Sequence, residues 1–183
     1  MAELTYPGQR QRSKRSNGNR NADPSVRPRG VPAIAAGLVA GIAFLATLSV
    51  LGAIVEGDAT WMPFHQIAAM LLGPSAMEDP GAFDATVVFA SLAVHAGLSM
   101  IYGLMMAFLI VEFSPDSAPW VGAVCGALLY LVNLYGFTGL YPWMAEWRGG
   151  VTLFAHVVFG TLLSMCYWSL HETEGAEQRL SAG

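Results

Sequence analysis

Two histidines inside long apolar stretches are the residues of this sequence best suited to chemistry. His95 lies in the run 85–111 and His156 in the run 151–170, and neither run contains Asp, Glu, Lys or Arg. An imidazole can donate, accept or transfer a proton near neutral pH, and it can also ligate a metal. An ionisable residue within an apolar span therefore indicates a candidate functional site.

Other polar residues share helical faces with these histidines. One stripe would hold Ser91, His95, Ser99 and Tyr102, and a second would hold Thr152, His156, Gly160, Ser164 and Tyr167, since residues three or four apart lie on the same side of a helix. Asn133 adds an amide in the run 119–141. An amide or imidazole that faces lipid would lose its hydrogen bonds at a cost of several kcal/mol, so we expect these side chains to face inward.

The depths of the three groups agree with a common site. With a rise of 1.5 Å per residue, His156 lies roughly 8 Å from Val151, Asn133 roughly 12 Å from Tyr141, and His95 roughly 15 Å from Ala85. If all three depths are counted from the same side, the residues can converge in one half of a bundle. The candidate intramembrane polar cluster consists of His95, Ser99, Tyr102, Asn133 and His156.

Three interpretations of this cluster remain open. The side chains could only stabilise the bundle through hydrogen bonds between helices. They could transfer protons or bind a small polar solute. His95 and His156 could instead ligate the iron of a haem b, as an electron carrier would require. Apart from that alternative we expect no cofactor and no metal site. We expect His65 at the membrane interface and His171 in solvent.

The elements that position these residues follow from the composition. The 183 residues are 54% hydrophobic and 12% charged, which favours a bilayer over water as the solvent. A spanning helix needs roughly 20 apolar residues, and four stretches reach that length. We therefore predict an all-α, polytopic membrane protein, a four-transmembrane-helix bundle with helices at about 31–55, 85–111, 119–141 and 151–170.

The remaining segments are shorter or polar. Residues 61–73 are apolar but too short to span, which predicts a short amphipathic helix on the outer side. Residues 1–30 predict a disordered basic tail, and residues 171–183 a polar tail that extends the last helix. Seven of the nine basic residues precede the first span, so the positive-inside rule predicts that both termini are cytoplasmic. Two glycine pairs, Gly37 with Gly41 and Gly122 with Gly126, predict close helix contacts.

The sequence gives no positive sign of an enzyme. It contains no nucleophile elbow, phosphate-binding glycine loop, metalloprotease helix motif or nucleotide fingerprint, so we assign no catalytic residue. Besides the lipid bilayer, the partners that remain open are a second copy of the chain or a larger membrane complex in which this protein is an accessory subunit. We expect no nucleic-acid partner.

Several motifs carry a family resemblance. The segments WMPFHQIAAMLLG, FDATVVFASLAVHAGLSMIYGL, GALLYLVNLYGFTGLYPWMAEWR and FAHVVFGTLLSMCY resemble a group of small bacterial inner-membrane proteins often labelled "sodium:proline symporter". The resemblance covers about residues 31–169 and implies a multi-pass protein of the bacterial inner membrane. It also implies recurring polar positions at His95, Tyr102, Asn133, Tyr135, Thr138 and His156. Symporters of known mechanism use inverted repeats of many helices, which four helices without a repeat do not form alone.

Overall fold

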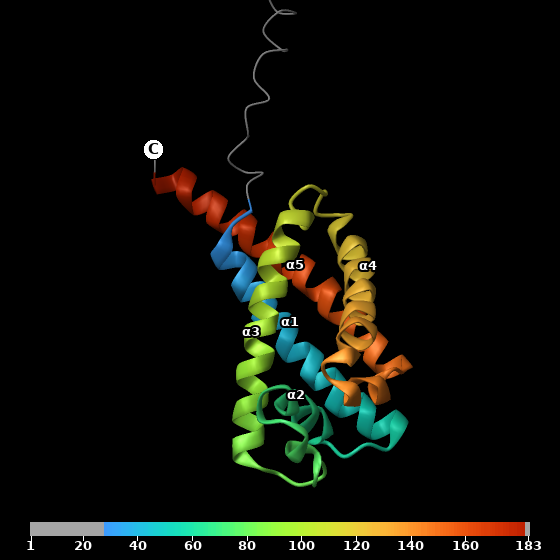
Figure 1. Cartoon of the computed structure of the whole chain (residues 1–183). Coiled ribbons are helices and arrows are strands. Elements are labelled where there is room, and N and C mark those ends of the chain that lie inside the picture. Colours follow the sequence, from blue (N-terminus) through green and yellow to red (C-terminus); the bar gives the residue numbers. More distant parts are fainter. Residues whose placement is uncertain (1–27, 182–183) are drawn as a thin grey trace, which may run out of the picture.

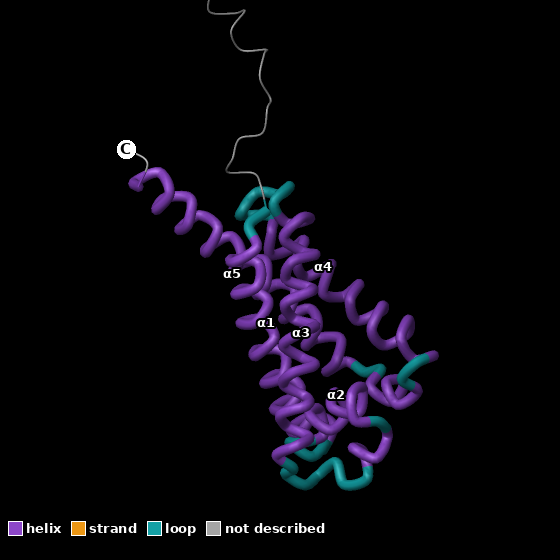
Figure 2. Tube along the Cα trace, turned by 60° about the vertical axis from the view of Figure 1, so that its left-hand side comes forward, coloured by secondary structure: helices purple, strands orange, loops and turns teal. Residues whose placement is uncertain are grey.

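The chain folds almost entirely into helices. The computed structural model describes residues 28–181, apart from the side chains of 174–179 and 181. Its α-helices are α1 (Gly30–Leu51), α2 (Met62–Leu72), α3 (Ala85–Ile110), α4 (Ala118–Leu131) and α5 (Gly150–Ser181). No described segment is a strand (Figure 2). The predicted all-α fold is confirmed.

Within the part of the chain that the structure describes, four helical segments are long and apolar enough to cross a membrane. They are Gly30–Glu56, Ala85–Ile110, Ala118–Gly139 and Gly150–Thr173, with hydropathies from 1.6 to 2.5 over their most apolar windows. The helix α2 is apolar but has only 11 residues, too few to span about 30 Å of hydrocarbon. Each span agrees closely with a predicted stretch, because the uncharged runs that define the spans are also the runs that form helices.

The four spans form a row rather than a closed square. The helix α5 packs against α4 on one side and against α1 on the other, while α1 also packs against α3. Figure 1 shows α3 and α4 on opposite sides of the crossing α1 and α5, with α2 beneath them. The start of α1 and the C-terminal part of α5 lie at the end opposite α2. We call these two ends the terminal end and the α2 end.

Small residues let the helix backbones approach closely at each crossing. A Cβ atom added to Gly37 would collide with the Ser99 carbonyl of α3, and one added to Gly103 would collide with the Ala33 carbonyl of α1. Lipid tails are as apolar as side chains, so close backbone contact, rather than hydrophobic burial, favours this association. The predicted role of Gly37 and Gly41 in helix contact is confirmed, and the contact lies within one chain.

The crossing of α4 and α5 is tighter still. An added Cβ at Gly126 would meet the carbonyl group of His156, and one at Gly160 would meet the Gly122 carbonyl oxygen and, at 2.8 Å, the Gly126 nitrogen. The pair Gly122 and Gly126 therefore acts as predicted. Its partner Gly160 had been assigned only to the polar face of the last helix.

His65 holds α2 to the loop that follows it. The ring nitrogen Nδ1 lies 2.6 Å from the Ala76 carbonyl oxygen, and Nε2 lies 2.9 Å from the Ala82 carbonyl oxygen. The side chain is 4% exposed. His65 therefore lies inside this small subdomain and not at its surface.

The terminal end is more ordered than the sequence suggested. The Arg29 backbone N–H donates to the Tyr167 hydroxyl at 3.3 Å, and Arg29 Nη1 donates to the His171 carbonyl oxygen at 3.2 Å. The His171 side chain is 4% exposed, so the expectation that it lies in solvent was wrong. Packing against Tyr167 and Trp168 buries it. The predicted disordered tail lies outside the described residues as far as residue 27.

The glycine contacts predict a sharp difference between two Gly→Ala substitutions. Gly126→Ala should lower the free energy of unfolding by about 1–3 kcal/mol, because the new methyl group must push α4 away from α5. The matched control is Gly97→Ala in α3, where an added Cβ meets nothing within 4 Å. It should raise stability by about 0.5–1 kcal/mol. Equilibrium unfolding in mild detergent compares the two, and equal effects would contradict the crossing.

Asp84 predicts a pH dependence at the start of α3. Its carboxylate accepts from the Val87 N–H at 3.2 Å and the Thr86 N–H at 2.7 Å. These hydrogen bonds lower the pKa of the Asp84 carboxyl from its ordinary 3.8. The cap therefore stabilises the fold fully above the unfolded pKa and is lost as the pH falls through the native pKa.

The measurement is the unfolding midpoint in detergent between pH 5 and 2.5, for the native chain and for Asp84→Asn. The amide keeps an acceptor but does not titrate, so the native chain should lose more stability on acidification. Parallel curves for the two proteins would show that this carboxylate contributes nothing.

Candidate functional site

Asn133 is placed by a break in the regular helix. We predicted one helix over 119–141, but α4 ends at Leu131 and continues as a π-helical turn, Val132–Gly136, followed by a 3₁₀ turn, Phe137–Gly139. Such wide turns free backbone carbonyls and often occur at functional sites. Arg148 Nε donates to the Leu134 carbonyl oxygen at 2.8 Å. The break therefore satisfies part of its backbone from the next connection along the chain.

A chain of hydrogen bonds joins three helical segments through Asn133. The Tyr102 hydroxyl of α3 donates to Asn133 Oδ1 at 2.6 Å, and Asn133 Nδ2 donates to His156 Nε2 at 3.3 Å. His156 Nδ1 then donates to the Thr152 carbonyl oxygen at 2.8 Å. The carbonyl can only accept, so Nδ1 carries the proton and Nε2 is the acceptor. Three of the predicted cluster residues thus meet as a connected network.

His95 stands apart from that network. Its Nε2 donates to the Gly41 carbonyl oxygen of α1 at 2.9 Å. The Phe44 ring stacks on the imidazole with centroids 5.4 Å apart, and the same ring meets His156 edge-on at 4.8 Å. Phe44 therefore contacts both histidines.

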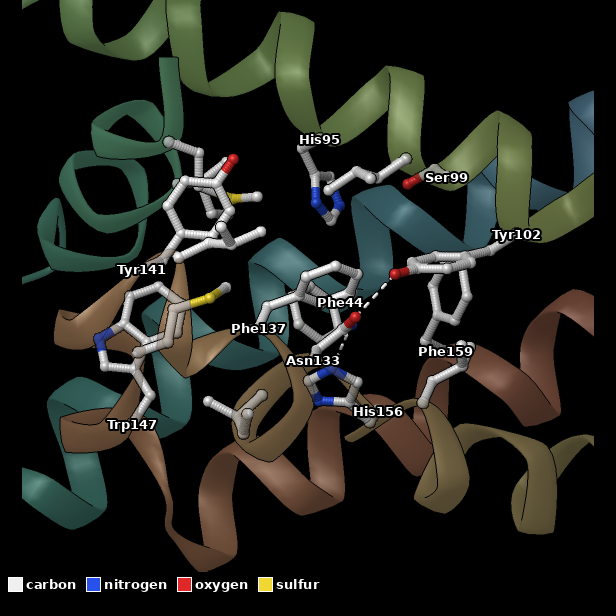
Figure 3. Close-up of a pocket in the computed structure, with 17 residues that line it drawn as sticks. Phe44, His95, Ser99, Tyr102, Asn133, Phe137, Tyr141, Trp147, His156 and Phe159 are labelled. Carbon is white, nitrogen blue, oxygen red and sulfur yellow. Dashed lines mark hydrogen bonds between the residues drawn. The ribbon is translucent and has the colours of Figure 1, made fainter. Parts of the chain in front are cut away.

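All five predicted cluster residues line one cavity. Its volume is about 260 Å³, and it lies toward the α2 end, where Ile67 and Met70 of α2 contribute to its wall. Figure 3 shows His95 and Tyr102 pointing from α3 toward Asn133, Phe44 and His156. Among the described residues, no Asp, Glu, Lys or Arg belongs to the lining; the other lining residues are aliphatic or aromatic. The five side chains thus face a space inside the bundle.

Ser99 is the least available member of the cluster. It is 2% exposed, and its hydroxyl has no hydrogen-bond partner among the described residues. A Cβ added to Gly41 would collide with this hydroxyl, so the oxygen lies against the α1 backbone. Ser99 therefore serves the close crossing of α1 and α3 at least as much as it serves the cavity.

Nothing in the sequence pattern indicated the aromatic wall of the cavity. Phe44, Phe137, Tyr141, Trp147 and Phe159 all line the cavity, yet they come from four separate segments. The apolar residues that face lipid and those that face a cavity are of the same types. No spacing rule therefore separates the two groups in a sequence. Only the polar residues, which must avoid lipid, revealed the site in advance.

The arrangement of the two histidines does not suit a haem between them. Axial ligation requires two imidazoles that face each other across the iron. Here the Phe44 ring contacts both imidazoles, and both Nε2 atoms already take part in hydrogen bonds. We therefore derive no redox chemistry from His95 and His156.

A second cavity adjoins the first at Trp147. It measures about 690 Å³ and is lined in part by Glu56, Asp58, Glu146 and Arg148. The guanidinium of Arg148 is occupied, since it lies 4.2 Å from the centre of the Tyr135 ring and donates to Thr138 Oγ1 at 3.2 Å. The α2 end thus has an acidic hollow next to the neutral, aromatic cavity.

Four apolar spans around a buried polar network define an integral membrane protein with a cavity inside its helical bundle. No protein-family model, curated protein or solved structure matches the chain. The resemblance to the small inner-membrane proteins labelled "sodium:proline symporter" therefore stays a prediction.

The Tyr102–Asn133 bond predicts a measurable coupling between α3 and the π-helical turn. In a double-mutant cycle, Tyr102→Phe and Asn133→Leu should couple by about 0.6 kcal/mol, and by no more than about 1.7 kcal/mol, in the free energy of unfolding. The control cycle pairs Tyr141→Phe with Asn133→Leu, since Tyr141 lines the cavity without bonding to Asn133. Additive effects in both cycles would show that the hydrogen bond between Tyr102 and Asn133 does not contribute to the stability of the fold.

Proposed function

We propose that this protein binds a small, mostly apolar solute in the cavity between α1, α3, α4 and α5. The cavity carries the proposal: about 260 Å³ of space, an aromatic and aliphatic wall, and a few converging polar groups. Binding sites for small molecules combine these features, with apolar surface providing affinity and polar groups fixing orientation.

The state of the polar groups supports binding rather than proton conduction. The network from Tyr102 through Asn133 to His156 ends on the Thr152 carbonyl, which cannot pass a proton on. His95 is not part of this chain and bonds to another carbonyl. A fixed network of this kind orients a ligand, whereas a proton path needs a continuous series of groups that both donate and accept.

The same proposal includes a bacterial inner membrane with both termini in the cytoplasm. The basic residues before α1 support this orientation through the positive-inside rule. An even number of spans also agrees with the start of α1 and the end of α5 lying at one end of the bundle (Figure 1). In this orientation the cavity lies in the outer half of the bilayer. Release of the solute across the membrane and membership of a larger membrane complex stay predictions.

Occupancy of the cavity can be followed through methionine methyl groups. Met70 and Met144 line the cavity, whereas Met105 is 62% exposed on the apolar surface. We expect saturable chemical-shift changes at Met70 and Met144 when ¹³C-methyl-methionine protein in detergent is titrated with a small aromatic molecule such as 4-propylphenol. A solute that merely dissolves in the micelle should shift Met105 as strongly as the other two.

Two neighbouring leucines of α4 give a matched pair of variants. Leu129 lines the cavity, while Leu128 is 54% exposed and points elsewhere. Leu129→Trp should fill the cavity and weaken binding at least tenfold, and Leu128→Trp should leave it unchanged. Equal affinities for the two variants would place the binding outside this cavity.

A further inference from the structure

The polar network of the cavity uses most of its hydrogens on other protein atoms. The Tyr102 hydroxyl gives its proton to Asn133, and His156 Nδ1 gives its proton to Thr152. Asn133 uses one amide hydrogen on His156, which leaves it a second one. The Ser99 hydroxyl is shielded against Gly41. Within the network from Tyr102 to His156, one hydrogen of Asn133 is therefore left for a ligand. The Ser99 hydroxyl and the Trp147 Nε1–H, whose residues also line the cavity, have no hydrogen-bond partner among the described residues.

His95 offers an acceptor that no described residue uses. Its Nε2 must carry a proton, because it bonds to the Gly41 carbonyl oxygen. No carboxylate lines the cavity to pair with an imidazolium, and an unpaired charge there would cost far more than a neutral ring. The neutral ring with a proton on Nε2 has a lone pair on Nδ1. That lone pair has no partner among the described residues.

The surroundings of His95 favour an aromatic body beside that acceptor. Phe44 stacks on the imidazole at an interplanar angle of 20°, and Phe159 packs edge-on against both Phe44 and Tyr102, with ring centroids 6.2 and 6.4 Å apart. Aromatic rings gain from stacked and edge-to-face contacts beyond the area that they bury. A further ring in the cavity could add to this cluster.

We infer that the solute is a lipophilic molecule with a hydroxyl group on or beside an aromatic ring, a phenol in its simplest form, whose O–H donates to His95 Nδ1. A hydroxyl also accepts, so it can use the remaining amide hydrogen of Asn133, which a purely donating or purely accepting group cannot do alongside His95. This inference rests on the proposed function, since it names the class of molecule for the same cavity.

The test compares two probes that differ in a single hydrogen-bonding proton. The probes are 4-propylphenol and 4-propylanisole, in which a methyl ether replaces the O–H. Both are titrated into the full chain in detergent while the Met70 and Met144 methyl signals are followed, and Met105 corrects for partition into the micelle. We expect the phenol to bind about fivefold more tightly, the factor that one net hydrogen bond supplies.

Two variants of His95 assign the preference to this residue. His95→Leu removes the acceptor and should abolish the preference for the phenol. His95→Gln should retain it, because its amide N–H can donate to Gly41 while its carbonyl oxygen accepts from the probe. A preference that persists in His95→Leu would overturn the assignment to His95. The comparison of the two probes on the native chain still tests the hydroxyl preference if one of the variants does not fold.

The outcomes separate this inference from the proposed function. Equal binding of both probes to the native chain would overturn the hydroxyl preference while the cavity remains a binding site. Probes that shift only Met105 would refute the proposed function, and the inference with it. Tighter binding of the phenol, lost in His95→Leu and kept in His95→Gln, would support both.

Discussion

Helices in a bilayer gain little from burying apolar side chains, because lipid is equally apolar, so the close approach of their backbones decides how this bundle assembles. At the α4–α5 crossing, Gly126 lies against the His156 carbonyl and Gly160 against the Gly122 carbonyl. At the α1–α3 crossing, Gly37 and Gly103 play the same part. These contacts make α5 and α1 the middle of a row and leave α3 and α4 apart at its two sides.

The cavity follows from that arrangement. Because α3 and α4 do not pack closely together along their lengths, a space remains between them at the α2 end. Side chains from other segments line it, including Phe44 of α1 and Trp147 of the last connection. The π-helical turn at Val132–Gly136 brings Asn133 within hydrogen-bonding distance of both Tyr102 and His156. One amide thereby links the two sides that helix packing leaves apart.

The sequence predicted the polar part of the site and missed its apolar part for one reason. A polar side chain cannot face lipid without losing hydrogen bonds, so the depths and faces of Asn133 and His156 were enough to place them together. The same reasoning predicted that His95 belongs to the cluster. It did not predict the hydrogen-bond partner of His95, because a backbone carbonyl such as that of Gly41 leaves no signal in a pattern of side chains. His171 was expected in solvent and is buried, and His65, expected at the membrane interface, is buried against the loop that follows α2.

By itself, the sequence determined that the chain crosses a membrane, which segments span it, and which polar residues must turn inward, because these properties depend only on local hydropathy and helical period. The tertiary structure decided the order of the helices, the break of α4 at Leu131, the tautomers of His95 and His156, and the placement of Phe44 between them. Those features depend on contacts between distant segments, and a cavity exists only where such contacts leave space.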